Sequence, residues 1–128
     1  MKIIVDTSVW IEYLKNTPGL VEKIDSALVE KNLYMVGTVV SELLQGARTE
    51  QDFDALNNSI GGVPFIEADF ADWKLTGRLS YQLRRKGITV PITDCLIAAI
   101  AINNSASIYT YDRHFKNIPD IKLVELPE

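Results

Sequence analysis

Short apolar runs alternate with helical segments along this chain, and that alternation restricts its possible folds more than any other feature. The apolar runs are rich in β-branched and aromatic residues, as buried strands are, and they cover residues 2–5, 33–37, 63–68, 106–112 and 121–126. Helical patterns fill the segments between them, at residues 8–15, 20–31, 39–47, 50–60, 69–87, 89–104 and, for a short turn, 113–118. Strands separated by helices predict an α/β fold with a five-stranded parallel sheet flanked by helices.

The size and composition of the chain narrow the classes of protein to which it can belong. Its 128 residues are close to the commonest domain size, so we expect a single domain over residues 1–128. One cysteine excludes an intrachain disulfide and favours a reducing compartment such as the cytoplasm. The longest apolar run, CLIAAIAI, is far too short to span a membrane. The net charge of −4 argues against a nucleic-acid partner unless the acidic residues are gathered in one place.

Acidic residues follow the predicted strands. Asp6 ends the first strand, and Glu42 lies about one turn into the helix after the second. Asp94 begins the apolar helix that leads to the fourth strand, and Asp112 ends that strand, with Thr110 two residues earlier on the same side. Ligands of parallel α/β sheets bind beyond the carboxyl ends of the strands, so we expect these side chains to meet at one edge.

Each acid also has an explanation that involves no ligand. Asp6 and Asp112 are suited to capping, Glu42 to a solvated helix surface, and Asp94 to the first turn of a helix capped by Thr93. These explanations weaken when the four acids are taken together. Two carboxylates about 5 Å apart repel by roughly 3 kcal/mol at an effective dielectric near 20, so a cluster needs cations or protonation. Oxygen ligands without a histidine among them favour a hard divalent ion, Mg²⁺ or Mn²⁺.

Four segments, taken in order, resemble a known family. They are IIVDTSVWIEYL, VVSELLQGA, TDCLIAAIA and IYTYDRHF, and their order and spacing are similar to those of PIN domains, in particular the VapC-type toxin ribonucleases of bacterial and archaeal toxin–antitoxin pairs. The resemblance covers essentially the whole chain. It implies a single PIN domain with a five-stranded parallel sheet, which agrees with the alternation of strands and helices.

The resemblance also implies roles for particular residues. It assigns metal binding and catalysis to four acids, which are Asp6, Glu42, Asp94 and Asp112. Ser8 and Thr110 stand where hydroxyl groups orient the first acid. Many members of the family have a further acid where this chain has His114, so the way in which the fourth acid binds metal is left open.

The function implied by the resemblance is that of a divalent-metal-dependent endoribonuclease. A metal-activated water would attack the RNA phosphodiester and leave a 3′-hydroxyl and a 5′-phosphate. The family pairs such a toxin with a small antitoxin that lies along a groove, and it also favours homodimers. Helices near SVWIEYL and VVSELLQGA are candidates for the groove walls, with Trp10 and Leu44 as predicted apolar anchors.

RNA binding requires positive charge, and the long helix supplies some. At 100° per residue, Lys74, Arg78 and Arg85 fall on one stripe with Tyr81 beside it, while the leucines face the other way. Such a stripe can hold phosphates and stack a base, or it can be an ordinary solvated helix face. Two other basic residues, Arg113 and Lys116, lie nearer the predicted metal site.

Other classes of protein fit less well. A response-regulator receiver needs an acidic pair after its first strand, where this chain has Thr7 and Ser8 after Asp6. A haloacid-dehalogenase-type phosphatase needs an aspartate at the position of Ser8. A PIN nuclease of RNA processing that is not a toxin, and a PIN domain that binds RNA or a partner without cleaving, both stay open as alternatives.

Overall fold

The computed structural model describes residues 1–126, and its strands form a parallel sheet in the order β3-β2-β1-β4. The strands are β1 (Ile3–Val5), β2 (Leu33–Val36), β3 (Phe65–Ile66) and β4 (Ser107–Tyr109). β1 is central, since Ile4 pairs with Tyr34 of β2 on one side and with Ile108 of β4 on the other. The predicted α/β architecture with a parallel sheet is confirmed.

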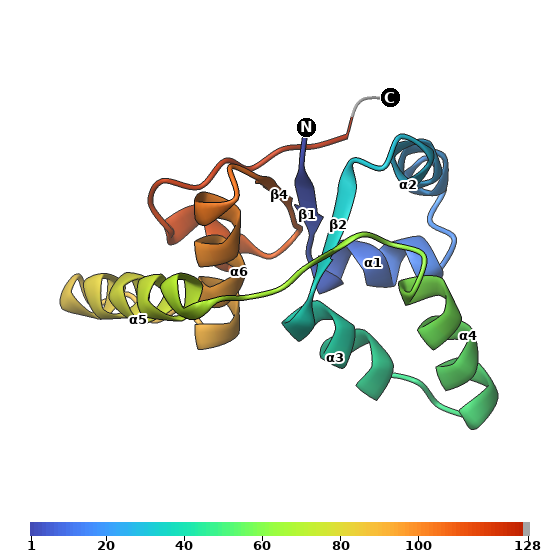
Figure 1. Cartoon of the computed structure of the whole chain (residues 1–128), viewed down its shortest axis with the longest axis horizontal. Coiled ribbons are helices and arrows are strands. Elements are labelled where there is room, and N and C mark those ends of the chain that lie inside the picture. The colour runs from blue at the N-terminus through green and yellow to red at the C-terminus, as the bar shows by residue number, and fades with distance from the viewer. Residues whose placement is uncertain (127–128) are drawn as a thin grey trace.

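Helices follow the strands in the predicted alternation (Figure 1). The α-helices are α1 (Thr7–Leu14), α2 (Leu20–Val29), α3 (Gly37–Gln45), α4 (Glu50–Ile60), α5 (Phe70–Arg85) and α6 (Ile92–Asn103), and a 3₁₀ helix, η1, covers Arg113–Asn117. Figure 1 shows α5 and α6 on one side of β1 and β2, and α1, α2 and α4 on the other. No helix within residues 1–126 is both long and apolar enough to cross a membrane.

The prediction of a fifth strand is wrong for the described residues, whose sheet has four strands. The segment at residues 121–126 reaches β4 but forms only one parallel bridge, between Ile108 and Leu123. At this bridge the N–H of Ile108 donates to the carbonyl of Lys122, and the N–H of Val124 donates to the carbonyl of Ile108. Asp120, in the left-handed region with φ 66°, turns the incoming chain just before the bridge.

The core is formed by the sheet and by the inner faces of α1, α2, α3, α5 and α6. Every residue of β1 is buried, and so are all residues of α6 from Asp94 to Ala101, as its apolar sequence predicts. The helix begins after Pro91, so Thr93 lies inside the first turn and is not the predicted cap. Ile92 and Thr93 are exposed, but Asp94 and the buried residues that follow it pack this end of α6 into the core.

Polar contacts lock α5 against α6. Asp69 caps α5 as predicted, because its carboxylate accepts a 2.9 Å hydrogen bond from the backbone N–H of Asp72. In turn, the carboxylate of Asp72 accepts a 2.9 Å hydrogen bond from the backbone N–H of Asp69. The other oxygen of Asp72, a residue only 2% exposed, accepts a 2.7 Å bond from the amide of Asn103 in α6. Gly87, with φ 77°, follows the end of α5, as its sequence position predicts.

Candidate active site

The four predicted acids lie at the carboxyl edge of the sheet. Asp6 follows β1 directly, Asp112 follows β4, Glu42 lies on the helix after β2, and Asp94 is in the first turn of α6. The negative charges of Asp112, Asp6 and Glu42 each raise the pKa of Asp94, which shows that the four carboxylates share one electrostatic environment. The structure therefore brings together the acids that the sequence predicts to meet.

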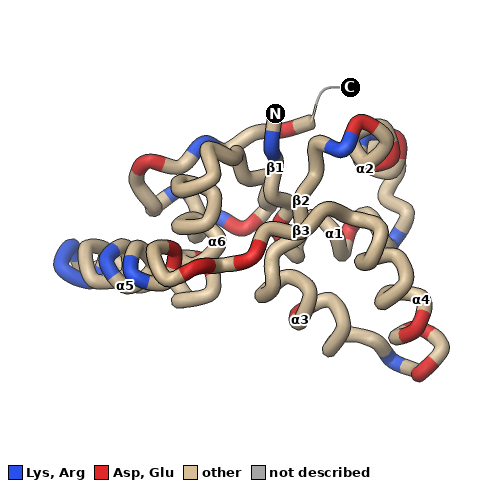
Figure 2. Tube along the Cα trace, in the orientation of Figure 1, with Lys and Arg blue, Asp and Glu red and all other residues tan. Residues whose placement is uncertain are grey.

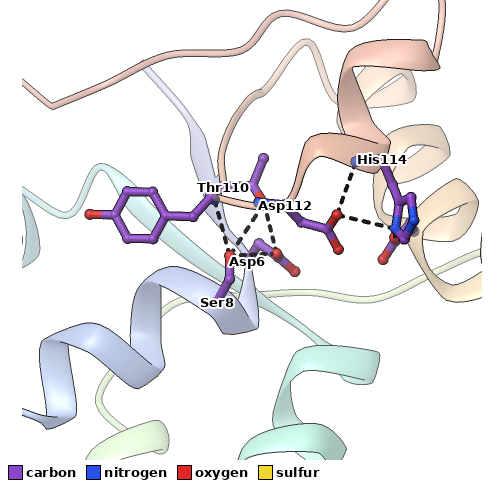
Figure 3. A network of polar contacts seen from close by, with 7 residues as sticks. Asp6, Ser8, Thr110, Asp112 and His114 are labelled. Carbon is purple, nitrogen blue, oxygen red and sulfur yellow. Dashed lines mark hydrogen bonds and ion pairs between the residues drawn. The ribbon is translucent and has the colours of Figure 1, made fainter.

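Asp6 is held by two hydroxyl groups (Figure 3). Ser8 donates a 2.9 Å hydrogen bond and Thr110 a 2.8 Å hydrogen bond to the same carboxylate oxygen, Oδ2. Thr110 Oγ1 also accepts from the backbone N–H of Asp112 at 2.9 Å, which fixes its orientation. Asp6 is only 6% exposed, so this network sets the direction of a nearly immobile carboxylate.

The structure distinguishes between helix capping and ligand binding as the role of Asp6. The residue occupies the N-cap position of α1, but its side chain makes no capping hydrogen bond to the helix. Its oxygen instead accepts from Ser8 and Thr110, which come from opposite ends of the chain. An aspartate whose capping function is unused, and which is oriented by two hydroxyl groups, is suited to a ligand site.

Asp94 is the most perturbed of the acids. Burial raises its pKa first, and the charges of Asp112 and Asp6 raise it further, to about 6, although His114 opposes the shift. Its Oδ2 atom is buried and receives no hydrogen bond from the residues of the described chain, 1–126. Buried polar atoms are normally satisfied, so this oxygen lacks the partner that a bound cation would supply. On this observation, the residues at this edge fit a divalent metal ion.

Asp112 and Glu42 complete the acidic set. Asp112 caps η1, as one of its two explanations predicts, because its Oδ1 accepts a 2.9 Å bond from the backbone N–H of His114. Glu42 is exposed and accepts a 3.3 Å hydrogen bond from the hydroxyl of Thr7. Partial burial and the charge of Asp6 raise the pKa of Glu42, while the bond from Thr7 lowers it.

Removing the charge of Asp94 should stabilise the metal-free protein in a pH-dependent way. The pKa of Asp94 in the folded chain is about 6, above its ordinary value of 3.8, so the unfolded chain loses this proton first as the pH rises. The ionised carboxylate therefore destabilises the fold above about pH 6, and this effect disappears as the pH falls toward 4. We expect Asp94→Asn to add on the order of 1 kcal/mol at about pH 8, with solvent screening taken into account, and progressively less between about pH 6 and pH 4.

Thermal unfolding in EDTA measures this change. Asp54→Asn, on the exposed surface of α4, removes the same charge away from the cluster and should leave the melting temperature nearly unchanged. A gain for Asp94→Asn that is equal at all pH values would contradict the assigned pKa.

The basic residues predicted to hold RNA are exposed. Lys74, Arg78 and Arg85 lie on the solvent side of α5, where Figure 2 shows positive charge concentrated, while Leu79 and Leu83 face the core. Tyr81, 60% exposed, and Arg85 line the same surface hollow of about 430 Å³. Arg113 and Lys116 are exposed on η1, directly after Asp112. These positions are compatible with RNA binding by either set.

A groove of about 550 Å³ runs between α1, α3 and α4 and reaches Glu42. Its apolar walls include Ile11 and Leu14, which are 42% and 46% exposed. The predicted apolar anchors are wrong in detail. Trp10 is only 4% exposed and lines a smaller pocket of about 110 Å³ that shares Leu14 with the groove, and Leu44 is half-buried outside the groove lining.

Some residues at the site escape prediction from the sequence. Thr7 is buried, and its hydroxyl donates a hydrogen bond to Glu42. In the sequence, only its position directly after Asp6 indicates that this hydroxyl lies at the site. Phe65 and Trp73, each more than half exposed, line a hollow of about 650 Å³ that also borders Glu42. The spacing of aromatic residues along the sequence does not show which of them are exposed and which belong to the core.

Comparison with known proteins gives a consistent result. The model of the PIN domain family matches residues 3–121. The VapC ribonuclease Mb1587 of Mycobacterium bovis and ribonuclease VapC11 of Mycobacterium tuberculosis are each 33% identical to this chain over an alignment of 124 residues, which covers 93% of this chain and 92% of theirs. The crystal structure of DNA-bound VapBC from Salmonella typhimurium is similar with a TM-score of 0.85, at 25% identity over 97% of both chains. That of VapBC2 from Rickettsia felis, bound to a promoter DNA fragment, has a TM-score of 0.84 at 23% identity, covering 97% of this chain and 98% of the other.

Proposed function

This chain belongs to the PIN domain family, and from that membership we propose that it is a divalent-metal-dependent endoribonuclease, the toxin of a toxin–antitoxin pair. One observation carries the proposal: the buried carboxylates of Asp6 and Asp94 share an edge of the sheet with Asp112 and Glu42, and one buried oxygen has no hydrogen-bond partner in residues 1–126. The relatives named as VapC ribonucleases support the reaction type. Residues 1–128 would form one PIN domain.

The roles of the residues follow from their geometry. Four carboxylates would hold Mg²⁺ or Mn²⁺, those of Asp6, Glu42, Asp94 and Asp112. Such an ion, when bound, supplies a water of lowered pKa and neutralises charge on the phosphodiester. Ser8 and Thr110 are positioning residues, because both hydroxyl groups orient the carboxylate of Asp6. The burial of Asp6 and Asp94 keeps two of the ligands preorganised before substrate arrives.

Cleavage of RNA in a purified system tests the proposal. We expect the protein to cut RNA with Mg²⁺ or Mn²⁺ and to stop when EDTA removes the metal, because the four acids alone repel the phosphate. Restoring the metal in excess should restore cleavage, which separates metal removal from unfolding. RNA binding without cleavage under all of these conditions would favour the catalytically silent PIN domain instead.

We propose that the stripe on α5 contributes to RNA binding, supported by its exposure and by the aromatic ring of Tyr81 beside Arg85. Replacing Lys74, Arg78 and Arg85 together by alanine should weaken binding and flatten its salt dependence. Each lost phosphate contact on a single strand lowers the slope of log K against log salt by about 0.7, so we expect a change of about 2.

Binding titrations at several salt concentrations measure the slope. Lys31→Ala is a suitable control, because Lys31 is exposed and precedes β2, at the end of the strands opposite the acids. If the triple variant keeps the slope of the unmodified protein, the stripe is an ordinary solvated face, and Arg113 and Lys116 become the candidates.

A small antitoxin is the partner that the groove between α1, α3 and α4 suits. The similar solved structures are of VapBC proteins, and the groove joins an apolar wall at Leu14 to the acid Glu42. An amphipathic segment of the partner could bury apolar side chains along α1 and bring a basic side chain to the acids. An arginine there would pair with Asp6 or Asp94 and compete with the metal.

Two further properties belong to the proposal. We propose a homodimer, for which the exposed rings of Phe65 and Trp73 offer an apolar face, and light scattering of the purified protein measures its mass. We also propose a cytoplasmic location, because the substrate class is cellular RNA. A PIN nuclease of RNA processing is the second candidate function, and growth on expression, described below, distinguishes it from a toxin.

A further inference from the structure

The ring of His114 lies against two of the proposed metal ligands (Figure 3). Its Nδ1 atom is 3.1 Å from Asp112 Oδ1 and 3.6 Å from Asp94 Oδ2. Each of the three residues offers one ligand atom, and these atoms all lie within 4.8 Å of one another. The structure therefore places the ring nitrogen of His114 among the acids of the site.

The position of this ring is set by its surroundings. The backbone N–H of His114 donates to Asp112 at 2.9 Å, so the histidine and the aspartate are fixed to one another at the start of η1. The next residue, Phe115, is fully buried and anchors the short helix in the core. The backbone of η1 therefore holds His114, whose side chain is 51% exposed, beside the two acids.

The spacing suits shared coordination of one ion. Adjacent ligands of an octahedral ion with bonds of roughly 2.1 Å are separated by about 3.0 Å. The distance of 3.1 Å between His114 and Asp112 matches this value, and the 3.6 Å to Asp94 needs only a small adjustment. An independent observation points the same way, because Asp94 Oδ2, the atom that faces the ring, is buried and receives no hydrogen bond within the described residues.

We propose that His114 Nδ1 binds the metal ion together with Asp94 and Asp112, and that this nitrogen makes the site prefer first-row transition ions such as Mn²⁺ over Mg²⁺. The inference rests on the proposed function, since it concerns the metal of the same site. Mg²⁺ is best served by oxygen ligands, whereas imidazole favours transition metals, whose affinities rise along the series that begins with Mn²⁺.

Metal binding to three forms of the purified protein tests this inference. Calorimetry gives the Mn²⁺ and Mg²⁺ affinities of the unmodified protein, of His114→Asp, which restores an oxygen ligand, and of His114→Ala, which removes the ligand. We expect the ratio of Mn²⁺ to Mg²⁺ affinity to fall about tenfold or more in His114→Asp. Pulsed EPR of bound Mn²⁺ should show coupling to an imidazole ¹⁴N nucleus in the unmodified protein and lose it in both variants.

The outcomes separate this inference from the proposed function. If the unmodified protein binds Mn²⁺ without ¹⁴N coupling, and the affinity ratio is the same in His114→Asp, then His114 only balances charge and the inference is wrong while the nuclease proposal stands. If none of the three forms binds either metal, although melting curves show that they are folded, both proposals are wrong. Retained ¹⁴N coupling in His114→Ala would assign the nitrogen to another group and also overturn the inference.

Discussion

Replacing Asp6 by asparagine should reduce RNA cleavage by at least about 100-fold while the protein stays folded. A metal ligand contributes several kcal/mol to transition-state stabilisation, and every 1.4 kcal/mol corresponds to about a factor of ten in rate. The amide keeps the shape of the side chain and can still accept from Ser8 and Thr110, so the loss would come from the missing charge. Single-turnover cleavage of a labelled RNA at saturating Mn²⁺ measures it.

Two matched variants make this experiment specific. Asp54→Asn removes a charge from the exposed surface of α4 and should cleave at the normal rate. Ser8→Ala removes one of the two hydroxyl groups that orient Asp6, and we expect a smaller loss, of about tenfold, because Thr110 still donates. Full activity in Asp6→Asn would refute the assignment of the metal site.

Expression of the protein without its partner should arrest the growth of a bacterial host, and Asp6→Asn should be harmless at the same level. Co-expression of the proposed antitoxin partner should restore growth. Within the proposed groove, Leu14→Arg should abolish that rescue, because Leu14 is 46% exposed there and a bound partner would remove the arginine in its place from water. We expect partner affinity to fall roughly 30-fold or more, as for the loss of an apolar anchor.

The control for the groove is an equally apolar site elsewhere. Val29, at the end of α2, is 82% exposed and lies outside the groove lining, so Val29→Arg should still be rescued. Cleavage of RNA by Leu14→Arg in vitro should be normal, which shows that the variant has lost its partner and not its activity. Normal growth with the unmodified protein, at levels where Asp6→Asn is equally harmless, would leave a PIN nuclease that is not a toxin.

The sequence predicts the acidic edge well because its determinants are local. The end of a strand at Asp6 and the start of a buried helix before Asp94 can each be recognised from a few residues. Because ligands of parallel sheets bind beyond the carboxyl ends of the strands, both residues are expected at the same edge. The positions of both residues follow from the backbone elements alone, so no side-chain conformation has to be known. The same reasoning places Asp112 after β4 and Glu42 on α3.

The errors fall where long-range packing decides. The segment at residues 121–126 has the composition of a strand, but among the described residues it meets β4 in a single bridge, at Leu123. Trp10 and Leu14 lie on the same helix, and only the packing of α1 shows that Trp10 is buried and Leu14 is open. The ring of His114 is placed by η1, whose backbone turns it toward the acids, and spacing along the chain does not contain that information.

Ser8 and Thr110, which hold the same oxygen of Asp6, are separated by 102 residues. During translation, Asp6 and Glu42 leave the ribosome before Asp94, and Asp112 follows last of the four acids. A nascent chain therefore lacks the complete acidic set until Asp112 has emerged. The groove, in contrast, is lined by residues between Ile11 and Ser59, all from the first half of the chain. The surface that we propose for the antitoxin is therefore synthesised before two of the four acids, Asp94 and Asp112.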